Sequence, residues 1–280
     1  MNDISLRLSV VDGWFSIVPG VTITIIFVIF YLAYRVRFRY RKFPHYEEID
    51  KRPASEILNR HFRTFLFWMV APLENYLVKA KVLPNAITLV SLVLAFISGI
   101  LLAIGNFGLG GWIYIFSGIC DIFDGRVARK TGNVTPSGGI IDSVADRYSE
   151  FSVFAGLAWF YSGSWVIVVV FAAFFGSLMV SYVRAKSESF NIKCDIGRFQ
   201  RPERLVCLGI GTALSPFLSA LIESGDTPRY GLTIVVLLII AIGSNSTAIY
   251  RVFHSYTHLT KRPPKEFVQI KIENVPGSRA

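Results

Sequence analysis

The stretch "DIFDGRVARKTGNVTPSGGIIDSVAD", residues 121–146, holds four aspartates inside one of the most apolar regions of the chain. Asp121 and Asp124 are three positions apart, and Asp142 and Asp146 are four apart. At these spacings each pair lies on one face of a helix. The segment between the pairs is rich in Gly, Asn and Pro, which predicts a turn that folds the second helix back on the first. We therefore expect the two acidic faces to meet.

Four converging carboxylates repel one another, and a lone charge near the bilayer centre costs at least about 2.5–3.5 kcal/mol. One or two divalent cations would remove this repulsion, and oxygen-only ligands favour magnesium, manganese or calcium over zinc. The alternative is a buried salt-bridge cluster with a purely structural role. Only Arg126, Arg129 and Arg147 are near in sequence to neutralise it.

The residues between the aspartates suit a phosphate ligand. Gly125 and Ala128 are small and lie on or beside the carboxylate face, so a ligand can approach the backbone there. Arg129 follows about two helical turns after Asp121, and a guanidinium suits a pyrophosphate. Two metal ions and an arginine are a common means of holding a diphosphate during in-line attack.

The composition is that of a membrane protein. Hydrophobic residues make up 52% of the chain and charged residues 17%, and the mean hydropathy is +0.49. Long apolar runs alternate with short basic stretches, which indicates several membrane spans. We attribute the net charge of +10 to cytoplasmic loops and lipid headgroups rather than to nucleic acid, although some basic residues could bind an anionic substrate. The three cysteines predict no disulfide framework.

The first apolar segment, Trp14–Tyr34, precedes the basic run 35–42, so the positive-inside rule places that end in the cytoplasm. Residues Ile57–Val70 predict an amphipathic helix that either rests in the membrane interface or packs on the protein. Six further apolar segments form a unit with both ends cytoplasmic: Ala86–Ile104, Gly111–Val127, Gly139–Trp159, Trp165–Val183, Arg204–Leu221 and Leu232–Val252.

The aspartate stretch is similar to the signature of the CDP-alcohol phosphotransferase family. Every signature position is filled, in the order Asp121-x2-Asp124-Gly125-x2-Ala128-Arg129-x8-Gly138-x3-Asp142-x3-Asp146. The resemblance covers roughly residues 81–251, and "PNAIT" at 84–88 resembles the start of the family's first core helix. It implies an all-α polytopic membrane protein with a six-helix catalytic core, here extended by one N-terminal transmembrane helix and an interfacial amphipathic helix.

In this family an acceptor alcohol attacks the β-phosphate of a CDP-linked lipid, and CMP leaves. The resemblance implies that Asp121, Asp124 and Asp142 hold two Mg2+ ions, or Mn2+. It implies that Asp146 shares the second metal and acts as the general base for the acceptor hydroxyl. The implied CDP-lipid contacts are Asn85, Thr88, Gly125, Ala128, Arg129 and Thr135.

The stretch 181–205 carries six basic residues, which suggests a second bound anion or simply a cytoplasmic loop. Its pattern resembles the phosphatidylinositol-phosphate synthases of bacteria and their archaeal relatives, whose acceptor is inositol 1-phosphate. The order of Arg184 and Lys186 and the glutamine at position 200 depart from that pattern, so glycerol 3-phosphate stays an alternative acceptor. The implied contacts to the acceptor phosphate are Ser181, Arg184, Arg201, Arg204 and Arg251.

These inferences divide the chain into a transmembrane helix and linker (1–54), a juxtamembrane helix (55–80), a catalytic membrane domain (81–256) and a cytoplasmic tail (257–280). We expect CDP-diacylglycerol as the donor, membrane lipids but no nucleic acid as partners, and a homodimer. The expected location is the cell (inner) membrane, with the active site facing the cytoplasm. The main alternative outside enzymes is a cation transporter, which predicts acids spread over several helices.

Overall fold

The protein is an all-helical membrane protein, described by a computed structural model for residues 2–39, 44, 60–197, 199–223 and 229–261. Most of the predicted linker, the start of the predicted amphipathic helix and the tail after residue 261 lie outside the described residues. No strand occurs in the part that is described. The helices are α1 (Asn2–Arg37), α3 (Arg60–Lys79), α4 (Pro84–Ala103), α5 (Phe107–Thr131), α6 (Pro136–Phe160), α7 (Val166–Glu188), α8 (Arg201–Ile222) and α9 (Gly231–Thr260).

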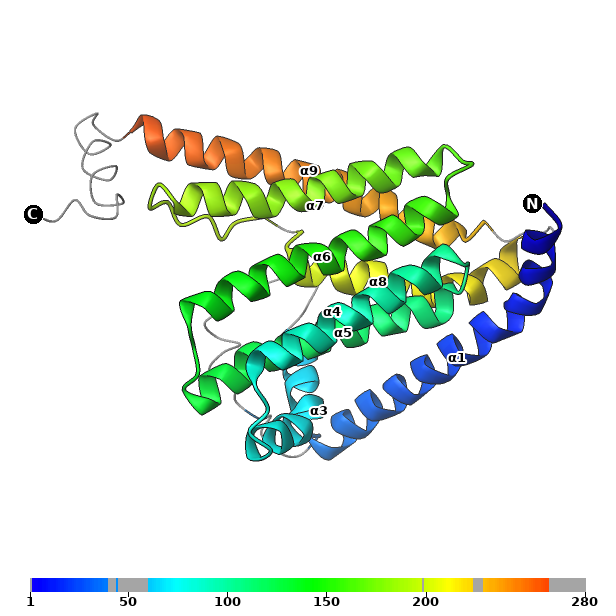
Figure 1. The fold of residues 1–280 in the computed structure, drawn as a ribbon, viewed down its shortest axis with the longest axis horizontal. Helices are drawn as coiled ribbons and strands as arrows, with labels where there is room; N and C mark the ends of the chain where they lie inside the picture. The colour runs from blue at the N-terminus through cyan, green and yellow to red at the C-terminus, as the bar shows by residue number, and fades with distance from the viewer. Residues whose placement is uncertain (1, 40–43, 45–59, 198, 224–228, 262–280) are drawn as a thin grey trace, which may run out of the picture.

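Five segments are long and apolar enough to cross a membrane: Ile17–Arg37 within α1, and α4, α7, α8 and α9. The other two long helices, α5 and α6, have 25 residues each and carry the four aspartates. They run alongside α4 within the bundle (Figure 1). The predicted fold class is confirmed, and the acids help to explain why α5 and α6 are not among these five segments.

Helix α4 packs against both α5 and α6 and so links the two acidic helices. Its approach to α6 depends on glycine at both sides of the crossing. A Cβ on Gly156 would lie 2.0 Å from the Gly99 carbonyl oxygen, and a Cβ on Gly99 would lie 2.3 Å from the Ser152 carbonyl oxygen. Small residues allow this backbone contact in a membrane, where lipid is as apolar as a leucine side chain and packing must bring helices together.

The predicted turn between the acidic helices forms where the sequence places it. Gly132 ends α5 with φ 72°, a left-handed conformation that glycine adopts without a steric cost. Thr135 is the N-cap of α6, and its hydroxyl accepts a hydrogen bond from the Gly138 amide at 3.1 Å. Pro136 follows at the first helical position, where proline's missing N–H costs no hydrogen bond.

Helix α3 is held against the end of α5 by a buried carboxylate. Glu74 is fully buried; Arg126 donates to it at 2.8 Å, and the Lys130 ammonium lies 2.8 Å from it. The Arg126 guanidinium also lies over the Phe67 ring, 4.1 Å from its centroid. Burial opposes ionisation of Glu74, but hydrogen bonds from Lys130 and Arg126 outweigh it and hold the pKa of the carboxyl below its ordinary value.

We predict that Glu74→Gln lowers the free energy of unfolding by about 3 kcal/mol at pH 7, because it leaves the buried Arg126 charge without its partner. A depressed pKa in the folded state contributes stability above the ordinary glutamate pKa, and this contribution is lost as the pH falls through the folded value. The difference between wild type and variant should therefore shrink below pH about 4.5, the ordinary value. Denaturant unfolding in detergent at pH 7 and at pH 4 measures it.

The matched control is Glu188→Gln, since Glu188 is exposed and forms a surface pair with Arg184 at 2.8 Å. Such a pair contributes at most about 0.5 kcal/mol, and the control should stay within that limit. Equal losses in the two variants, or a Glu74→Gln loss that does not change with pH, would contradict the assigned role.

Candidate active site

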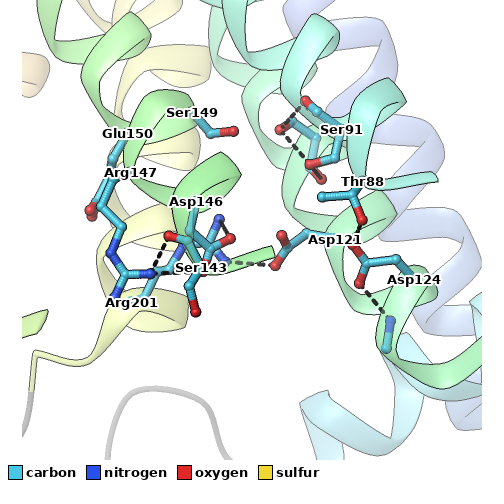
Figure 2. Close-up of polar contacts among 12 residues, drawn as sticks. Thr88, Ser91, Asp121, Asp124, Ser143, Asp146, Arg147, Ser149, Glu150 and Arg201 are labelled. Carbon is cyan, nitrogen blue, oxygen red and sulfur yellow. Dashed lines mark hydrogen bonds and ion pairs between the residues drawn. The ribbon is translucent and has the colours of Figure 1, made fainter. Parts of the chain in front are cut away.

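Three of the four predicted aspartates converge between α5 and α6. Asp121, Asp142 and Asp146 each offer a carboxylate oxygen, and these oxygens all lie within 4.8 Å of one another. Figure 2 shows Asp121 and Asp146 on different helices with their carboxylates turned toward each other. The three side chains are half-buried. Because like charges at this range repel strongly, a nearby cation stabilises the group.

In this structure a side chain supplies that cation. The Arg201 guanidinium, at the start of α8, donates from Nη1 to Asp121 Oδ2 at 2.6 Å, and its Nη2 lies 2.7 Å from Asp146 Oδ1. Its planar fork thus bridges an acid of α5 and an acid of α6. Arg147 lies farther off, 4.0 Å from Asp146, and donates instead to the Ser143 carbonyl.

Asp124 is buried and is not one of these three grouped acids, although it lines the same cavity. Its carboxylate accepts a hydrogen bond from the Thr88 hydroxyl of α4 at 2.6 Å and one from the Gly125 amide at 2.5 Å (Figure 2). Thr88, a predicted CDP-lipid contact, therefore orients an aspartate in this structure. The four-aspartate ligand set stays a prediction, of which the structure groups three.

Four of the other predicted CDP-lipid residues form two sets, Gly125 with Arg129 and Asn85 with Thr135. A Cβ on Gly125 would lie 3.1 Å from Arg129 Nη1, so glycine leaves room for this guanidinium along α5. Asn85 and Thr135 both flank Gly138, since a Cβ there would lie 3.6 Å from Asn85 Oδ1 and 3.0 Å from Thr135 Oγ1.

Arg204, another predicted acceptor residue, is 2% exposed. It donates to Glu150 from Nε at 2.9 Å and from Nη2 at 2.8 Å, and from Nη1 to the Phe199 carbonyl at 3.0 Å. Arg184 is more exposed and pairs with Glu188 and with Asp195, at 2.8 and 2.7 Å.

Arg251 is equally buried, at 2% exposed, but its partners are neutral. It donates to the Ile196 carbonyl at 2.8 Å and to the Val180 carbonyl at 2.7 Å. No carboxylate forms an ion pair with it among the residues that the structure describes. A buried cation without a counterion is expensive, so an anion in the adjacent space would be stabilised.

A single cavity of about 850 Å³ joins the acidic and basic groups. Four of the predicted CDP-lipid residues do not line this cavity: Asn85, Thr88, Ala128 and Thr135. The predicted site residues that line it are Asp121, Asp124, Gly125, Arg129, Asp142, Asp146, Ser181, Arg184, Arg201, Arg204 and Arg251.

Sequence analysis missed two buried acids of this cavity. Glu150 lies four residues after Asp146, so its helical spacing was a usable signal for its place on the same face of α6. Glu203 is 3% exposed and lies 3.9 Å from Arg63 of α3, a contact between distant helices that no spacing rule reveals.

The chain is similar in sequence to a known protein family. A sequence model of the CDP-alcohol phosphatidyltransferase family matches residues 81–244, more than half of the chain. The phosphatidylinositol phosphate synthase of Mycolicibacterium smegmatis is 30% identical over 189 residues, covering 65% of this chain and 81% of that protein. An uncharacterized protein of Aquifex aeolicus is 30% identical over 202 residues, covering 71% of this chain and 95% of that protein.

Solved structures show the same fold. The Mycobacterium tuberculosis phosphatidylinositol phosphate synthase in complex with manganese and citrate superposes with a TM-score of 0.59 at 25% identity, over 66% of this chain and 88% of that one. A structure of that synthase with CDP-DAG bound has a TM-score of 0.58 at 24% identity, over 66% of this chain and 92% of that one. With the complete aspartate signature inside the matched region, the chain belongs to the CDP-alcohol phosphatidyltransferase family and is a membrane-bound transferase.

Proposed function

We propose that the protein transfers the phosphatidyl group of CDP-diacylglycerol to the hydroxyl of inositol 1-phosphate and releases CMP. Support for the donor comes from the family and from the similar synthase whose structure is described with CDP-DAG bound. Support for the acceptor comes from relatives named phosphatidylinositol phosphate synthase.

The observation that carries the proposal is that acidic and basic side chains line one cavity. Asp121, Asp142 and Asp146 group in this cavity, and Arg184, Arg204 and Arg251 also line it. A diphosphate donor held at the acids leaves Arg251, which has two carbonyl partners, beside the space for a second anion. An acceptor that carries a phosphate fits this arrangement better than a neutral alcohol, because buried arginine recognises phosphate oxygens.

The acid group also suits divalent cations. Its donors are carboxylate oxygens from α5 and α6 that lie within 4.8 Å of one another, the ligand chemistry that Mg2+ and Mn2+ prefer. We propose that Asp121, Asp142 and Asp146 hold them, with Asp124 as the fourth acid and two Mg2+ ions as the resident set. When bound, the cations neutralise the carboxylates and withdraw charge from the diphosphate.

Different residues of the chain then bind the two substrates and transfer the proton. Arg129 binds the diphosphate of the donor beside Gly125, and Arg201 moves from the acids to the acceptor phosphate. Asp146 takes the proton of the acceptor hydroxyl while the hydroxyl oxygen bonds to the β-phosphorus of the donor. The bond from that phosphorus to the oxygen of the CMP phosphate breaks, and CMP leaves with the electron pair.

We further propose a cell (inner) membrane location with the cavity facing the cytoplasm. The last turns of α1, α5 and α7 carry Arg35, Arg37, Arg129, Lys130 and Lys186. Basic residues at helix ends mark the cytoplasmic side.

Purified protein with Mg2+ and CDP-diacylglycerol should release CMP when inositol 1-phosphate is the acceptor. Release should fall at least about tenfold with free inositol, because the arginines then lose their ionic hydrogen bonds. Glycerol 3-phosphate, which also carries a phosphate, is the informative rival. Faster release with glycerol 3-phosphate than with inositol 1-phosphate would overturn the acceptor while leaving the reaction class intact.

Asp146→Asn is the inactive control for this assay. Loss of the general base should lower kcat by about 100-fold or more. Retained turnover in this variant would remove Asp146 from the role of base.

Arg251→Gln should raise KM for the acceptor about tenfold or more and change KM for the CDP-lipid by less than about twofold. Arg251→Lys keeps the charge but not the planar guanidinium. Its KM for the acceptor should lie between the values of wild type and Arg251→Gln. Lys193→Gln is the matched control, since Lys193 is 87% exposed. Equal changes in both KM values for Arg251→Gln would remove it from the acceptor site.

A further inference from the structure

Helix α1 lies outside the residues that match the family, 81–244, yet it packs on two helices of the catalytic core. The Trp112 indole of α5 donates to the Gly20 carbonyl at 3.0 Å and contacts the Thr24 hydroxyl at 3.2 Å. A Cβ on Gly20 would lie 3.1 Å from the Ala213 carbonyl oxygen of α8. The first helix therefore packs against both α5 and α8, and it does not serve only as a membrane anchor.

Toward its C-terminal end α1 meets α3 through aromatic rings. The Phe27 ring lies 5.6 Å from Trp112 of α5, 6.3 Å from Phe62 and 5.4 Å from Phe65, both of α3 (ring centroids). Figure 1 shows α3 near the C-terminal end of α1. Phe27 thus closes the space between α1, α3 and α5.

That space belongs to the same cavity as the acids. Its wall continues from Asp121 along α5 to an apolar section made by Phe27, Phe62, Leu66, Trp112, Ile115 and Ile119. Asp121 and Trp112 are nine residues apart on one helix, so the apolar section extends about 13 Å from the acids. The acids thus lie at one part of the cavity, and the section near Phe27 is mostly aromatic and aliphatic, with the Arg63–Glu203 pair also in the wall.

We infer that α1 and α3 form the wall of an acyl-chain compartment, which holds one chain of the lipid donor while its diphosphate lies at the acids. This inference rests on the proposed function and names the part of the donor that the first helix contacts. The occupant follows from the continuity of the cavity, because a ligand bound at both ends must carry a charged group joined to a hydrocarbon chain.

The compartment acts on chain selection rather than on affinity. A chain that moves from the bilayer into the protein leaves one apolar environment for another, so it gains little hydrophobic free energy. Discrimination comes from fit against Phe27 and Leu66, since close-packed walls penalise both voids and overlap.

A competition between donors tests this. Equal amounts of dihexanoyl and dioleoyl CDP-diacylglycerol are offered in mixed micelles with the acceptor, and the two products are counted by mass spectrometry. Their ratio is internal to each sample, so a partly unfolded variant does not distort it. Leu66→Trp fills the compartment and should lower the long-to-short ratio about fivefold or more. Phe27→Ala enlarges it and should shift the ratio in the opposite direction.

Phe30→Ala is the matched control, because Phe30 is on the same helix and is 50% exposed. Its ratio should stay within about twofold of wild type, as expected where packing is not changed. An unchanged ratio in both test variants, or an equal shift in Phe30→Ala, would overturn the compartment. Absence of product from wild type with any donor would instead overturn the proposed function.

Discussion

Carboxylates that converge inside a membrane repel one another, and the site depends on how that repulsion is relieved. Asp121, Asp142 and Asp146 are held together by α5 and α6, and Arg201 of α8 bridges two of them. The carboxylates that the guanidinium pairs with also belong to the group suited to divalent cations. Arg201 therefore balances the charge of two of these acids in this structure, and we propose that it binds an anionic substrate when another cation takes that place.

The rest of the bundle fixes the distance between the acids. Helix α4 packs on both acidic helices, and the Gly99–Gly156 crossing sets its separation from α6. The short turn with Gly132 in a left-handed conformation reverses the chain, and Glu74 joins α3 to α5 through Arg126. Glycine and buried ion pairs appear where the elements that carry the acids must keep a fixed register.

Local patterns predicted much of this arrangement, and long-range contacts explain what they could not. The i,i+3 and i,i+4 spacings placed the aspartates on two facing helices, and the turn residues placed the reversal. Arg201 contacts Asp121 across 80 positions and Thr88 contacts Asp124 across 36, and no spacing rule predicts such pairs. The contribution of α1 to the cavity wall could not be predicted from the sequence either, because it arises only when α3 and α5 pack against α1.

The most direct test of the account is the position of manganese in crystals of the protein grown with Mn2+, located by anomalous scattering. We predict a peak among the Asp121, Asp142 and Asp146 carboxylates, with the Arg201 guanidinium withdrawn from Asp121 and Asp146. Manganese bound elsewhere, with Arg201 still bridging the two acids, would contradict the central claim.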